Sequence, residues 1–372
     1  MDFNDILKFM VDRKASDLFI TADVPPSIKV HGRISPVSKT KLNEKQTREL
    51  TLSLMSPEQR DEFHHTKECN FAIGVPGLGR FRVSAFVQRD AVGMVLRRIE
   101  TRIPTFDELS LPPILRDLAM TKRGIVFFVG ATGTGKSTSL AAMVGYRNQN
   151  STGHIISIED PIEFVHNHGG CIITQREVGV DTESYEVALR NTLRQAPDVI
   201  LIGEIRTRTA MEHAITFAET GHLVLTTLHA NNANQALDRI LHFFPEEQRA
   251  QVLMDLSLNL RGIIAQQLVR RPDGSGRRAI IEVLLNTPLA SDMIQKGDVH
   301  KLKDLMKRSR EQGMITFDQA LYDAYTRGEI AQEEALAHAD SSNEVRLMIK
   351  LGDTRPGSRS RDKDALGLVD DI

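Results

Sequence analysis

The sequence predicts an α/β protein that has a small N-terminal α+β domain and a larger phosphate-binding domain with a helical C-terminal region. Three observations support this prediction. A chain of 372 residues is too long for one compact core. Apolar strands alternate with amphipathic helices from about residue 125 to 243, which is typical of a largely parallel sheet covered on both faces. The motif Gly-x-x-x-x-Gly-Lys-Ser lies at 130–137, between an apolar run and a helical pattern.

The expected N-terminal domain spans residues 1–100, and a linker over 101–112 follows it. Apolar residues at helical spacing predict its helices, and alternation of apolar with polar residues predicts its strands. Short segments of turn-forming residues connect the last three strands, which indicates an antiparallel meander. Prolines punctuate the linker, so we expect a hinge there. The predicted elements are a helix over 4–13, one strand over 28–34, two helices within 42–65, and strands over 69–73, 81–87 and 94–96.

The second domain is expected over 113–351. Its ligand should lie at the carboxyl ends of the parallel strands, where the Gly-rich motif also lies. Residues 352–372 are polar and charged, so we expect a disordered tail. The predicted elements are helices from 114 to near 124 and over 137–146, 185–195, 209–219 and 233–243, strands over 125–129, 154–158, 171–175, 199–202 and 223–227, one long helical run over 246–270, a strand over 279–285, and three or four final helices.

Composition excludes several classes of protein. The 47 Lys and Arg residues against 49 Asp and Glu give a net charge of -2, which offers no general case for nucleic-acid binding. No apolar run reaches the roughly 20 residues of a membrane-spanning helix, and the acidic start differs from a secretion signal. Cys69 and Cys171 form no C-x-x-C pair, and no H-E-x-x-H pattern occurs. We therefore expect a reduced, cytoplasmic compartment and no structural metal.

The loop over 130–138 has the residue types that a phosphate-binding site needs. Glycines permit positive φ angles that turn backbone N–H groups inward, and the helix that follows contributes free amide donors and partial positive charge. Lys136 would reach the β- and γ-phosphates, and Ser137 would offer its hydroxyl to Mg²⁺. An ordinary Gly/Thr-rich turn is the alternative, but the flanking strand and helix argue against it. The residues expected to contact ATP are Gly133, Thr134, Gly135, Lys136, Ser137 and Thr138.

Two carboxylate clusters follow predicted buried strands. Glu159, Asp160 and Glu163 follow the strand over 154–158, and Glu204 follows the strand over 199–202. Hydrolysis of ATP needs carboxylates that position water and handle Mg²⁺, and these clusters lie at the expected edge of the sheet. Acidic residues also commonly cap loops and helix starts, and for Glu159 and Asp160 the two interpretations are equally good. Glu204 stands at a Walker B position, which favours a catalytic function.

Two histidines bracket the predicted strand over 223–227. His222 precedes this strand, and His229 follows it after Thr226 and Thr227. A single histidine is more often structural, and the sequence pattern alone leaves the two interpretations even. The arrangement is similar to a sensor of the γ-phosphate, an interpretation that needs support from outside the pattern.

That support is a family resemblance over residues 1–351. The chain resembles the PilT/PilU group of type IV pilus retraction ATPases, within the wider secretion-ATPase superfamily. The resemblance implies a PAS-like N-terminal domain and a RecA-like P-loop ATPase domain. The matching pieces are the Walker A element at 130–138, the Asp box at 158–163, the signature and Walker B element at 193–206, and the His box at 221–230.

The resemblance also implies roles for individual residues. Glu204 would orient the attacking water, with Glu163 assisting. His222 and His229 would sense the γ-phosphate. Arg82 and Arg97 of the N-terminal domain would swing onto the nucleotide phosphates, although a pair of arginines is also a common solvated surface feature. The sequence leaves open whether Arg194, Arg206 and Arg239 contact the site or a neighbouring subunit.

Assembly and location follow from the same resemblance. It implies a hexameric ring in the cytoplasm, peripheral to the inner membrane at the pilus base. The implied partners are a PilT-type paralogous ATPase and an inner-membrane pilus platform protein, and the implied cofactors are ATP and Mg²⁺. The segment 286–294 lacks the Ala-Ile-Arg sequence of PilT-like proteins, which points to the PilU-like accessory branch. Thr207 stands where many relatives have an acidic residue.

Three alternatives stay open. The first is a scaffold that binds nucleotide with little hydrolysis of its own, although all the expected catalytic residue types are present. The second is a nucleic-acid motor, which the near-neutral charge and the 5% aromatic content disfavour. The third is a pilus assembly or type II secretion ATPase, which the short N-terminal region and the missing C-x-x-C pair disfavour.

Overall fold

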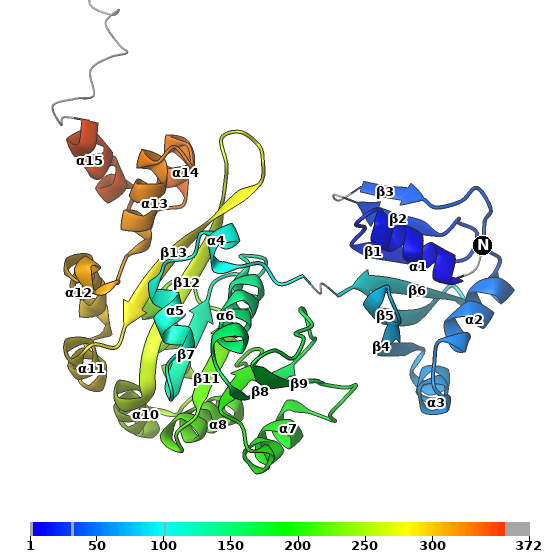
Figure 1. Cartoon of the computed structure of the whole chain (residues 1–372), viewed down its shortest axis with the longest axis horizontal. Coiled ribbons are helices and arrows are strands. Elements are labelled where there is room, and N and C mark those ends of the chain that lie inside the picture. The colour runs from blue at the N-terminus through cyan, green and yellow to red at the C-terminus, as the bar shows by residue number, and fades with distance from the viewer. Residues whose placement is uncertain (1–2, 31–32, 100–101, 354–372) are drawn as a thin grey trace, which may run out of the picture. The chain divides into compact units, whose positions relative to one another are not determined.

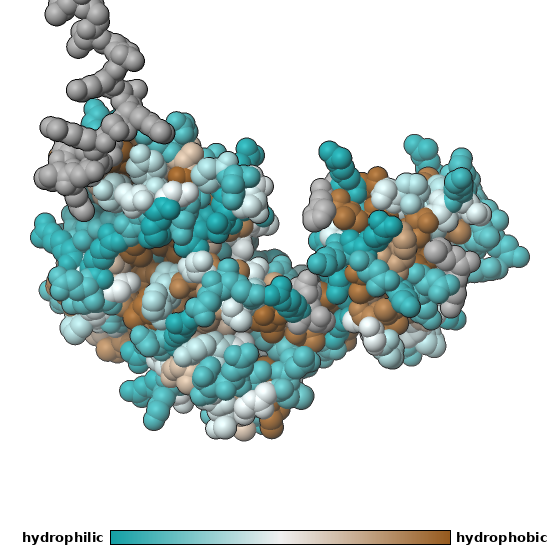
Figure 2. All heavy atoms as spheres, turned by 45° about the horizontal axis from the view of Figure 1, so that its top comes forward, coloured by the Kyte–Doolittle hydropathy of each residue, from teal (hydrophilic) through white to brown (hydrophobic). Residues whose placement is uncertain are grey.

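The computed structural model describes residues 3–30, 33–99 and 102–353 (Figure 1). Two β-sheets organise these residues, one of six strands and one of seven. Each sheet has helices packed beside it, so the predicted mixture of α and β structure is confirmed. Polar and charged side chains cover most of the face drawn in Figure 2, with apolar side chains showing between them. Every helix among the described residues is too short or too polar to cross a lipid bilayer.

The six-stranded sheet belongs to the N-terminal part of the chain. Its strand order is β3-β2-β1-β6-β5-β4, and its hydrogen-bonded neighbours are antiparallel. Fully buried apolar residues of α1, β1, β5 and β6 form the core beside it. The elements are α1 (Phe3–Asp12), β1 (Asp17–Ile20), β2 (Ser27–Val30), β3 (Arg33–Pro36), α2 (Glu44–Ser53), α3 (Pro57–Thr66), β4 (Glu68–Val75), β5 (Gly79–Gln88) and β6 (Ala91–Arg98).

Most of these elements were predicted, including the meander of β4, β5 and β6. The single strand predicted over 28–34 is wrong, because β2 and β3 form an antiparallel hairpin within that segment, with Val30 opposite Arg33. Residues 31–32, between the two strands, lie outside the described residues. Strand β1 was not predicted, because it has only four residues and begins with a charged side chain.

The seven-stranded sheet has the order β13-β12-β7-β11-β10-β8-β9. Strands β8, β9, β10 and β11 pair in parallel, as predicted. The elements up to β11 are α4 (Phe106–Leu109), α5 (Ile114–Ala119), β7 (Gly124–Val129), α6 (Lys136–Asn150), β8 (Gly153–Glu159), β9 (Cys171–Glu177), α7 (Tyr185–Thr192), a 3₁₀ turn (Leu193–Gln195), β10 (Val199–Ile202), α8 (Arg208–Glu219) and β11 (Leu223–Leu228).

Helices dominate the rest of the chain, and in the described residues five α-helices follow β13, where three or four were predicted. The last of them, α15, ends at Asp353 and so includes the first two residues of the expected tail, and residues 354–372 lie outside the described residues. The elements are α9 (Ala233–His242), α10 (Glu246–Asn259), β12 (Leu260–Arg270), β13 (Arg277–Leu285), α11 (Pro288–Gln295), α12 (Leu302–Arg308), α13 (Phe317–Thr326), α14 (Gln332–Ala337) and α15 (Ser342–Asp353), with short 3₁₀ turns before α12 and after it.

The long helical run predicted over 246–270 is wrong. Helix α10 ends at Asn259, and Leu260 adopts an extended conformation with φ -62° and ψ 140°. From Gly262 to Arg270 the chain pairs with β13 in an antiparallel ladder. The apolar residues keep a helical spacing throughout this segment, but the backbone groups of β12 pair with β13, the next strand along the chain, and this hairpin pairing overrides the local pattern.

The chain forms two compact units. The P-loop up to Lys136, helix α9 and the C-terminal helices belong to the second unit, and the carboxylate clusters belong to the first. The first unit comprises Met1–Leu109, Leu115–Ile125 and Ser137–Thr227, and the second comprises Ser110–Ile114, Val126–Lys136 and Leu228–Ile372.

Candidate active site

The P-loop follows β7, whose six residues are all buried. Gly133 and Gly135 have φ angles of 79° and 84°, a region that favours glycine. Lys136 is 9% exposed, and its Nζ donates hydrogen bonds to the carbonyl oxygens of Gly130 and Ala131, both at 2.8 Å. The ammonium group is therefore held across the mouth of the loop. Ser137 and Thr138 are half-buried in the first turn of α6.

A buried glutamine of β12 braces the P-loop from behind. Gln266 is 2% exposed, and its Nε2 donates to the carbonyl oxygen of Thr134 at 2.8 Å. The Gln266 carbonyl oxygen would lie 2.6 Å from a Cβ at Gly130, so the loop backbone and β12 approach too closely for any other residue. No local sequence signal marks Gln266, because the P-loop and β12 are 132 positions apart at this contact.

A cavity of about 430 Å³ lies beside the P-loop in the second unit. One wall is Gly130 and Ala131, and another is α9 with the loop that precedes it. His229 lies in that loop, and its Nδ1 donates to the Gly130 carbonyl oxygen at 3.3 Å. Arg239 of α9 also lines the cavity, so the structure brings it and His229 to the P-loop. The lining residues are Gly130, Ala131, His229, Ala230, Asn231, Gln235, Asp238, Arg239 and His242.

Glu204, at the predicted Walker B position, lies in an ion pair that the sequence pattern does not indicate. Arg206 donates from Nε (2.9 Å) and from Nη2 (2.8 Å) to Oε2 of Glu204. This hydrogen bond raises the pKa of Arg206. Arg206 Nη1 also lies 3.7 Å from Oδ2 of Asp160, so Arg206 links the two predicted carboxylate clusters. The loop that carries Glu204 is fixed by Thr227, whose Oγ1 donates to the Gly203 carbonyl oxygen at 2.6 Å.

Glu159 ends β8 and is hydrogen-bonded by two polar side chains. Its carboxylate accepts hydrogen bonds from Ser157 Oγ (2.7 Å) and Gln175 Nε2 (3.2 Å). Burial raises the pKa of Glu159 to about 6, although these bonds and the backbone N–H of Glu163 oppose the shift. The side chain of Glu163 is exposed. Glu159 is therefore held by its own neighbours, whereas Glu163 projects into solvent, where it is free to meet water.

The two histidines of the His box occupy opposite ends of β11. His222 precedes the strand, and its Nδ1 lies 3.0 Å from the carbonyl oxygen of Phe217 at the end of α8. Its own carbonyl oxygen accepts from the N–H of Gly124, where β7 begins. His229 comes after the end of β11. Seven residues of extended chain span about 23 Å, so the structure does not bring His222 and His229 together.

Arg82 and Arg97 stand directly opposite each other on β5 and β6. Arg97 also donates from Nε to Oδ1 of Asp17 at 2.8 Å. Asp17 is 4% exposed and faces Arg97 in the register of β1 with β6. The structure thus brings the two arginines together and adds a buried carboxylate that neutralises one of them. Sequence reasoning missed Asp17 because it missed β1.

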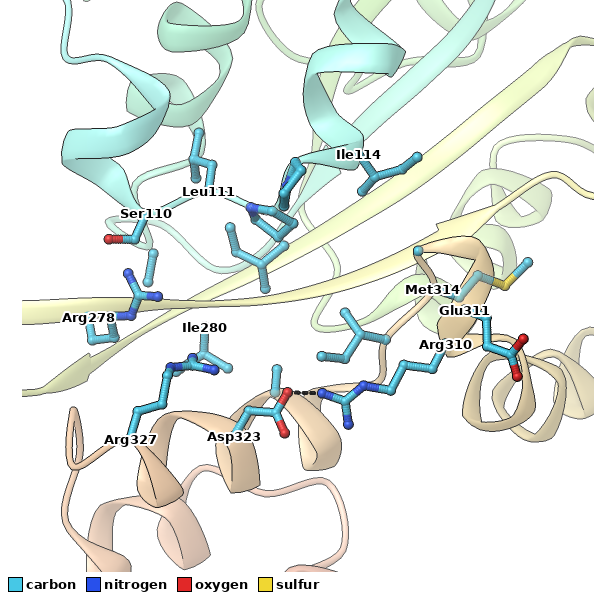
Figure 3. Close-up of a pocket in the computed structure, with 17 residues that line it drawn as sticks. Ser110, Leu111, Ile114, Arg278, Ile280, Arg310, Glu311, Met314, Asp323 and Arg327 are labelled. Atoms are coloured by element: carbon cyan, nitrogen blue, oxygen red, sulfur yellow. Dashed lines mark hydrogen bonds and ion pairs between the residues drawn. The ribbon is translucent and has the colours of Figure 1, made fainter.

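A second cavity, of about 540 Å³, lies among residues 110–114, β13 and α13 (Figure 3). Its walls are largely apolar, and none of the residues predicted to contact ATP lines it. Its three arginines are paired with carboxylates, Arg310 with Asp323, and Arg278 and Arg327 with Glu329. The cavity beside the P-loop is therefore the better nucleotide site.

Metal binding by protein side chains alone is not indicated. The described residues contain no group of three or more His, Cys, Asp or Glu side chains that could hold a metal ion. A Mg²⁺ ion would therefore depend on nucleotide oxygens together with the hydroxyl of Ser137. This donor set fits a hard cation that prefers oxygen ligands and keeps several waters.

Comparisons with known proteins identify the family of this chain. Residues 2–336 match the family described as type II/IV secretion system protein. The chain is 71% identical over 352 residues to the type IV pilus ATPase PilU of Pseudomonas aeruginosa, covering 95% of this chain and 92% of the relative. It is 39% identical to the type IV pilus retraction ATPase PilT of the same organism, covering 90% and 97%.

Solved structures give the same result. The crystal structure of the pilus retraction motor PilT with bound ADP has a TM-score of 0.87 at 38% identity, covering 93% of this chain and 99% of that chain. The ATPase DotB of Legionella pneumophila has a TM-score of 0.73 at 26% identity, covering 91% and 96%. The predicted family and the predicted N-terminal domain with a RecA-like ATPase domain are confirmed. The chain belongs to the type II/IV secretion system protein family and, within it, to the PilT/PilU group of type IV pilus retraction ATPases.

Proposed function

We propose that this chain is an ATP-hydrolysing motor of the PilU type, which powers or assists type IV pilus retraction as an accessory to a PilT-type ATPase. The observation that carries the proposal is the P-loop cradle with Lys136 across its mouth, beside a cavity that His229 and Arg239 also line. ATP is the substrate. Its negative phosphate oxygens match the loop N–H groups, the start of α6 and the ammonium of Lys136.

Each residue of the site then has a defined task. Lys136 exchanges its bonds to the Gly130 and Ala131 carbonyl oxygens for phosphate oxygens, and Ser137 is the residue that would hold Mg²⁺ with the nucleotide. Bound Mg²⁺ would neutralise charge that develops on the phosphate oxygens. His229 senses the γ-phosphate, because it already contacts the P-loop carbonyl of Gly130.

Glu204 orients the attacking water, and Glu163 assists it. In the structure Glu204 is engaged by Arg206, so this ion pair must open or rearrange before Glu204 accepts a proton from water. A role for His222 in the same response would have to act through β11, because its side chain lies at the other end of that strand. Arg82 and Arg97 supply positive charge to the phosphates from the N-terminal domain, and Asp17 restrains Arg97.

The proposal extends to assembly. The domains are residues 1–100 and 113–351, joined by the linker over 101–112 and followed by the tail. We place the protein as a hexameric ring in the cytoplasm, at the inner-membrane base of the pilus. There it would act with a PilT-type paralogue on the pilus platform protein. A ring suits a site whose arginines come from a separate domain, because domain rotation can complete or open it.

An ATPase assay of the purified chain tests the proposal. Wild-type protein should hydrolyse ATP in the presence of Mg²⁺. Lys136→Ala should lose both nucleotide binding and turnover, while Glu204→Ala should keep binding and lose turnover by about 100-fold or more. Unchanged secondary structure by circular dichroism is the control for folding. Normal turnover in Glu204→Ala would overturn the role given to that carboxylate.

A second candidate is a scaffold that binds nucleotide but hydrolyses little of it by itself. The ion pair between Glu204 and Arg206 favours this candidate, because an engaged carboxylate neither orients nor deprotonates water well. Tight binding of a fluorescent ADP analogue by the isolated chain, together with no measurable hydrolysis of ATP, would support it. Turnover by the isolated chain would exclude it.

A further inference from the structure

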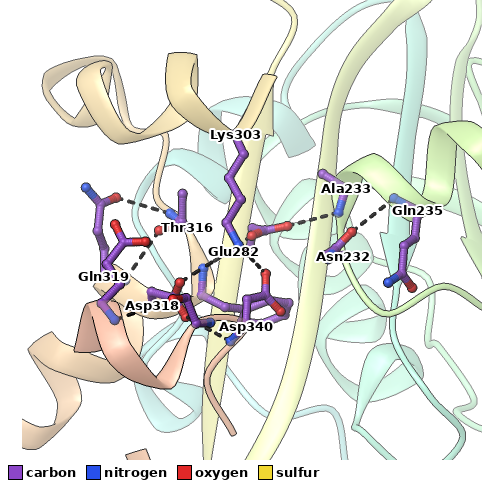
Figure 4. Close-up of polar contacts among 12 residues, drawn as sticks. Asn232, Ala233, Gln235, Glu282, Lys303, Thr316, Asp318, Gln319 and Asp340 are labelled. Atoms are coloured by element: carbon purple, nitrogen blue, oxygen red, sulfur yellow. Dashed lines mark hydrogen bonds and ion pairs between the residues drawn. The ribbon is translucent and has the colours of Figure 1, made fainter. Parts of the chain in front are cut away.

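One buried carboxylate in the second unit joins the starts of two helices. Glu282 of β13 is 2% exposed. Its Oε1 accepts a hydrogen bond from the backbone N–H of Ala233, the first residue of α9, at 2.9 Å. Its Oε2 accepts from the backbone N–H of Phe317, the first residue of α13, at 3.2 Å. Figure 4 shows Glu282 between α9 on one side and the C-terminal helices on the other.

Helix α9 leads directly to the nucleotide cavity. Ala233 comes four positions after His229, and the first turn of α9 is fixed further by Asn232, whose Oδ1 accepts from the N–H of Gln235 at 3.0 Å. Residues of α9 and of the loop before it make up most of the lining beside the P-loop. The position of the first turn of α9 therefore sets the shape of that cavity.

The other side of Glu282 leads into a network among the C-terminal helices. Asp318 of α13 accepts through Oδ1 from the backbone N–H groups of Asp340 (2.8 Å) and Ser341 (3.2 Å). Lys303 of α12 places its Nζ 2.7 Å from Asp340 Oδ2 and 3.8 Å from Asp318 Oδ2. Helix α12, helix α13 and the segment between α14 and α15 are thus tied together next to Glu282 (Figure 4).

Resting on the proposed function, we propose that Glu282 is a positioning residue that couples the nucleotide-facing segment 229–242 to the C-terminal helices, by holding the first N–H of α9 and the first N–H of α13 on its two carboxylate oxygens. The side-chain N-caps, Asn232 for α9 and Thr316 for α13, accept only from the third residue of each helix. Glu282 accepts from the first residue of both helices, which these caps leave unbonded. Glu282 lies on a third element, β13, and contacts both helices. A shift of α9 would therefore move the carboxylate that also binds α13, and the reverse.

The charge state of Glu282 bears on this connection. Burial raises the pKa of Glu282 to about 7, the nearby Asp340 adds to the shift, and Lys303 opposes it. Asp318 faces the same lysine. A protonated carboxyl group has one oxygen that donates rather than accepts, so it can hold only one of the two N–H groups well. The connection should weaken as pH falls through 7.

Two variants remove one link each without removing the helices. Glu282→Gln keeps the shape but offers one acceptor oxygen, and its amide N–H₂ faces the other backbone N–H. Ala233→Pro removes the donor on α9 and sets the buried proline ring against the Glu282 carboxylate, so it breaks this link completely. Proline is tolerated at the first position of a helix, and Asn232 before it is already extended, with φ -150° and ψ 178°. Glu329→Gln is the matched control, since Glu329 pairs with Arg278 and Arg327 away from α9.

The turnover number of each single variant should fall about tenfold, because misplaced site residues slow the chemical step more than they weaken binding. The dissociation constant for a fluorescent ADP analogue should stay within about threefold, since Glu282 does not touch the P-loop. The double variant should be no slower than either single variant. The turnover number of the wild type should decline below pH 7, and this decline should be absent in Glu282→Gln. The proposal would be overturned if the double variant lost turnover by the product of the two single losses. It would also be overturned if the turnover of Glu282→Gln lay within about twofold of that of the Glu329→Gln control.

Hydrogen–deuterium exchange measures the same coupling in the absence of ATP hydrolysis. Adding ADP to the wild-type chain should slow amide exchange in both 229–242 and 302–341, and in Glu282→Gln only in 229–242. If ADP slows amide exchange in 229–242 of the wild type but leaves exchange in 302–341 unchanged, the proposed coupling does not exist. This result does not depend on whether any variant folds. Absence of ATP turnover with an intact exchange response would refute the motor function instead.

Discussion

Alanine at two P-loop glycines should separate the folding of the loop from its binding of phosphate. A Cβ at Gly130 would lie 2.6 Å from the backbone carbonyl oxygen of Gln266 and 2.6 Å from Thr134 Oγ1. A Cβ at Gly133 would meet no described atom within 4 Å. Both glycines have positive φ angles, 153° and 79°. The two substitutions thus differ in what the new methyl group touches.

The expected magnitudes differ accordingly. Gly133→Ala should lower the free energy of unfolding by about 1–2 kcal/mol, which is the strain of a left-handed residue with a side chain. Gly130→Ala adds a contact that β12 must move to relieve, so we expect backbone strain of about 1–3 kcal/mol plus about 1–3 kcal/mol of overpacking. The space that Gly133 leaves open is where phosphate should lie, so a methyl group there should weaken nucleotide binding by about tenfold or more, or about 1.4 kcal/mol.

Urea unfolding and titration with a fluorescent ADP analogue measure the two quantities. Gly133→Ala should bind poorly and unfold at a moderately lower urea concentration than the wild type, whereas Gly130→Ala should unfold at a lower concentration still. A Gly130→Ala protein as stable as the wild type would refute the packing described here, because β12 would then not lie against the P-loop. Wild-type affinity in Gly133→Ala would show that phosphate does not enter this cradle.

Three further predictions follow from contacts of single side chains. Gln266→Leu should destabilise the protein by about 1 kcal/mol in urea unfolding and weaken nucleotide binding, because a P-loop carbonyl loses its donor, and equal affinity would contradict the bracing role. Arg82→Ala should lower ATP turnover more than Arg97→Ala does, since Asp17 already neutralises Arg97, and the reverse order in a turnover assay would argue against this. Burial raises the pKa of Glu159 to about 6 and lowers that of His166 to about 4, so between about pH 6.5 and 4.5 acidification stabilises the fold through Glu159 and destabilises it through His166. Glu159→Gln removes only the first effect and should lose stability more steeply on acidification in that range, which unfolding at several pH values would check.

Local sequence was enough for much of the fold. The glycines and Lys136 of the P-loop, the strand before it and the helix after it are one continuous segment, so their arrangement follows from backbone sterics and side-chain chemistry over a few residues. The same holds for the parallel strands that precede Glu159 and Glu204, whose apolar runs are read directly. Errors arose where two interpretations share one pattern, as in 246–270, where a helical spacing of apolar residues continues into a strand.

By itself, the sequence determined that this protein has a phosphate cradle, carboxylates after neighbouring strands and a histidine-bounded strand, because each depends on residues that are close along the chain. Only the tertiary structure decided their partners. Gln266 behind the P-loop, Arg206 on Glu204, Asp17 on Arg97 and Glu282 between α9 and α13 are all fixed by how the folded chain packs. The physical reason is that a buried polar group must find its hydrogen-bond partner wherever packing places one, and for three of these four contacts that partner is remote in sequence.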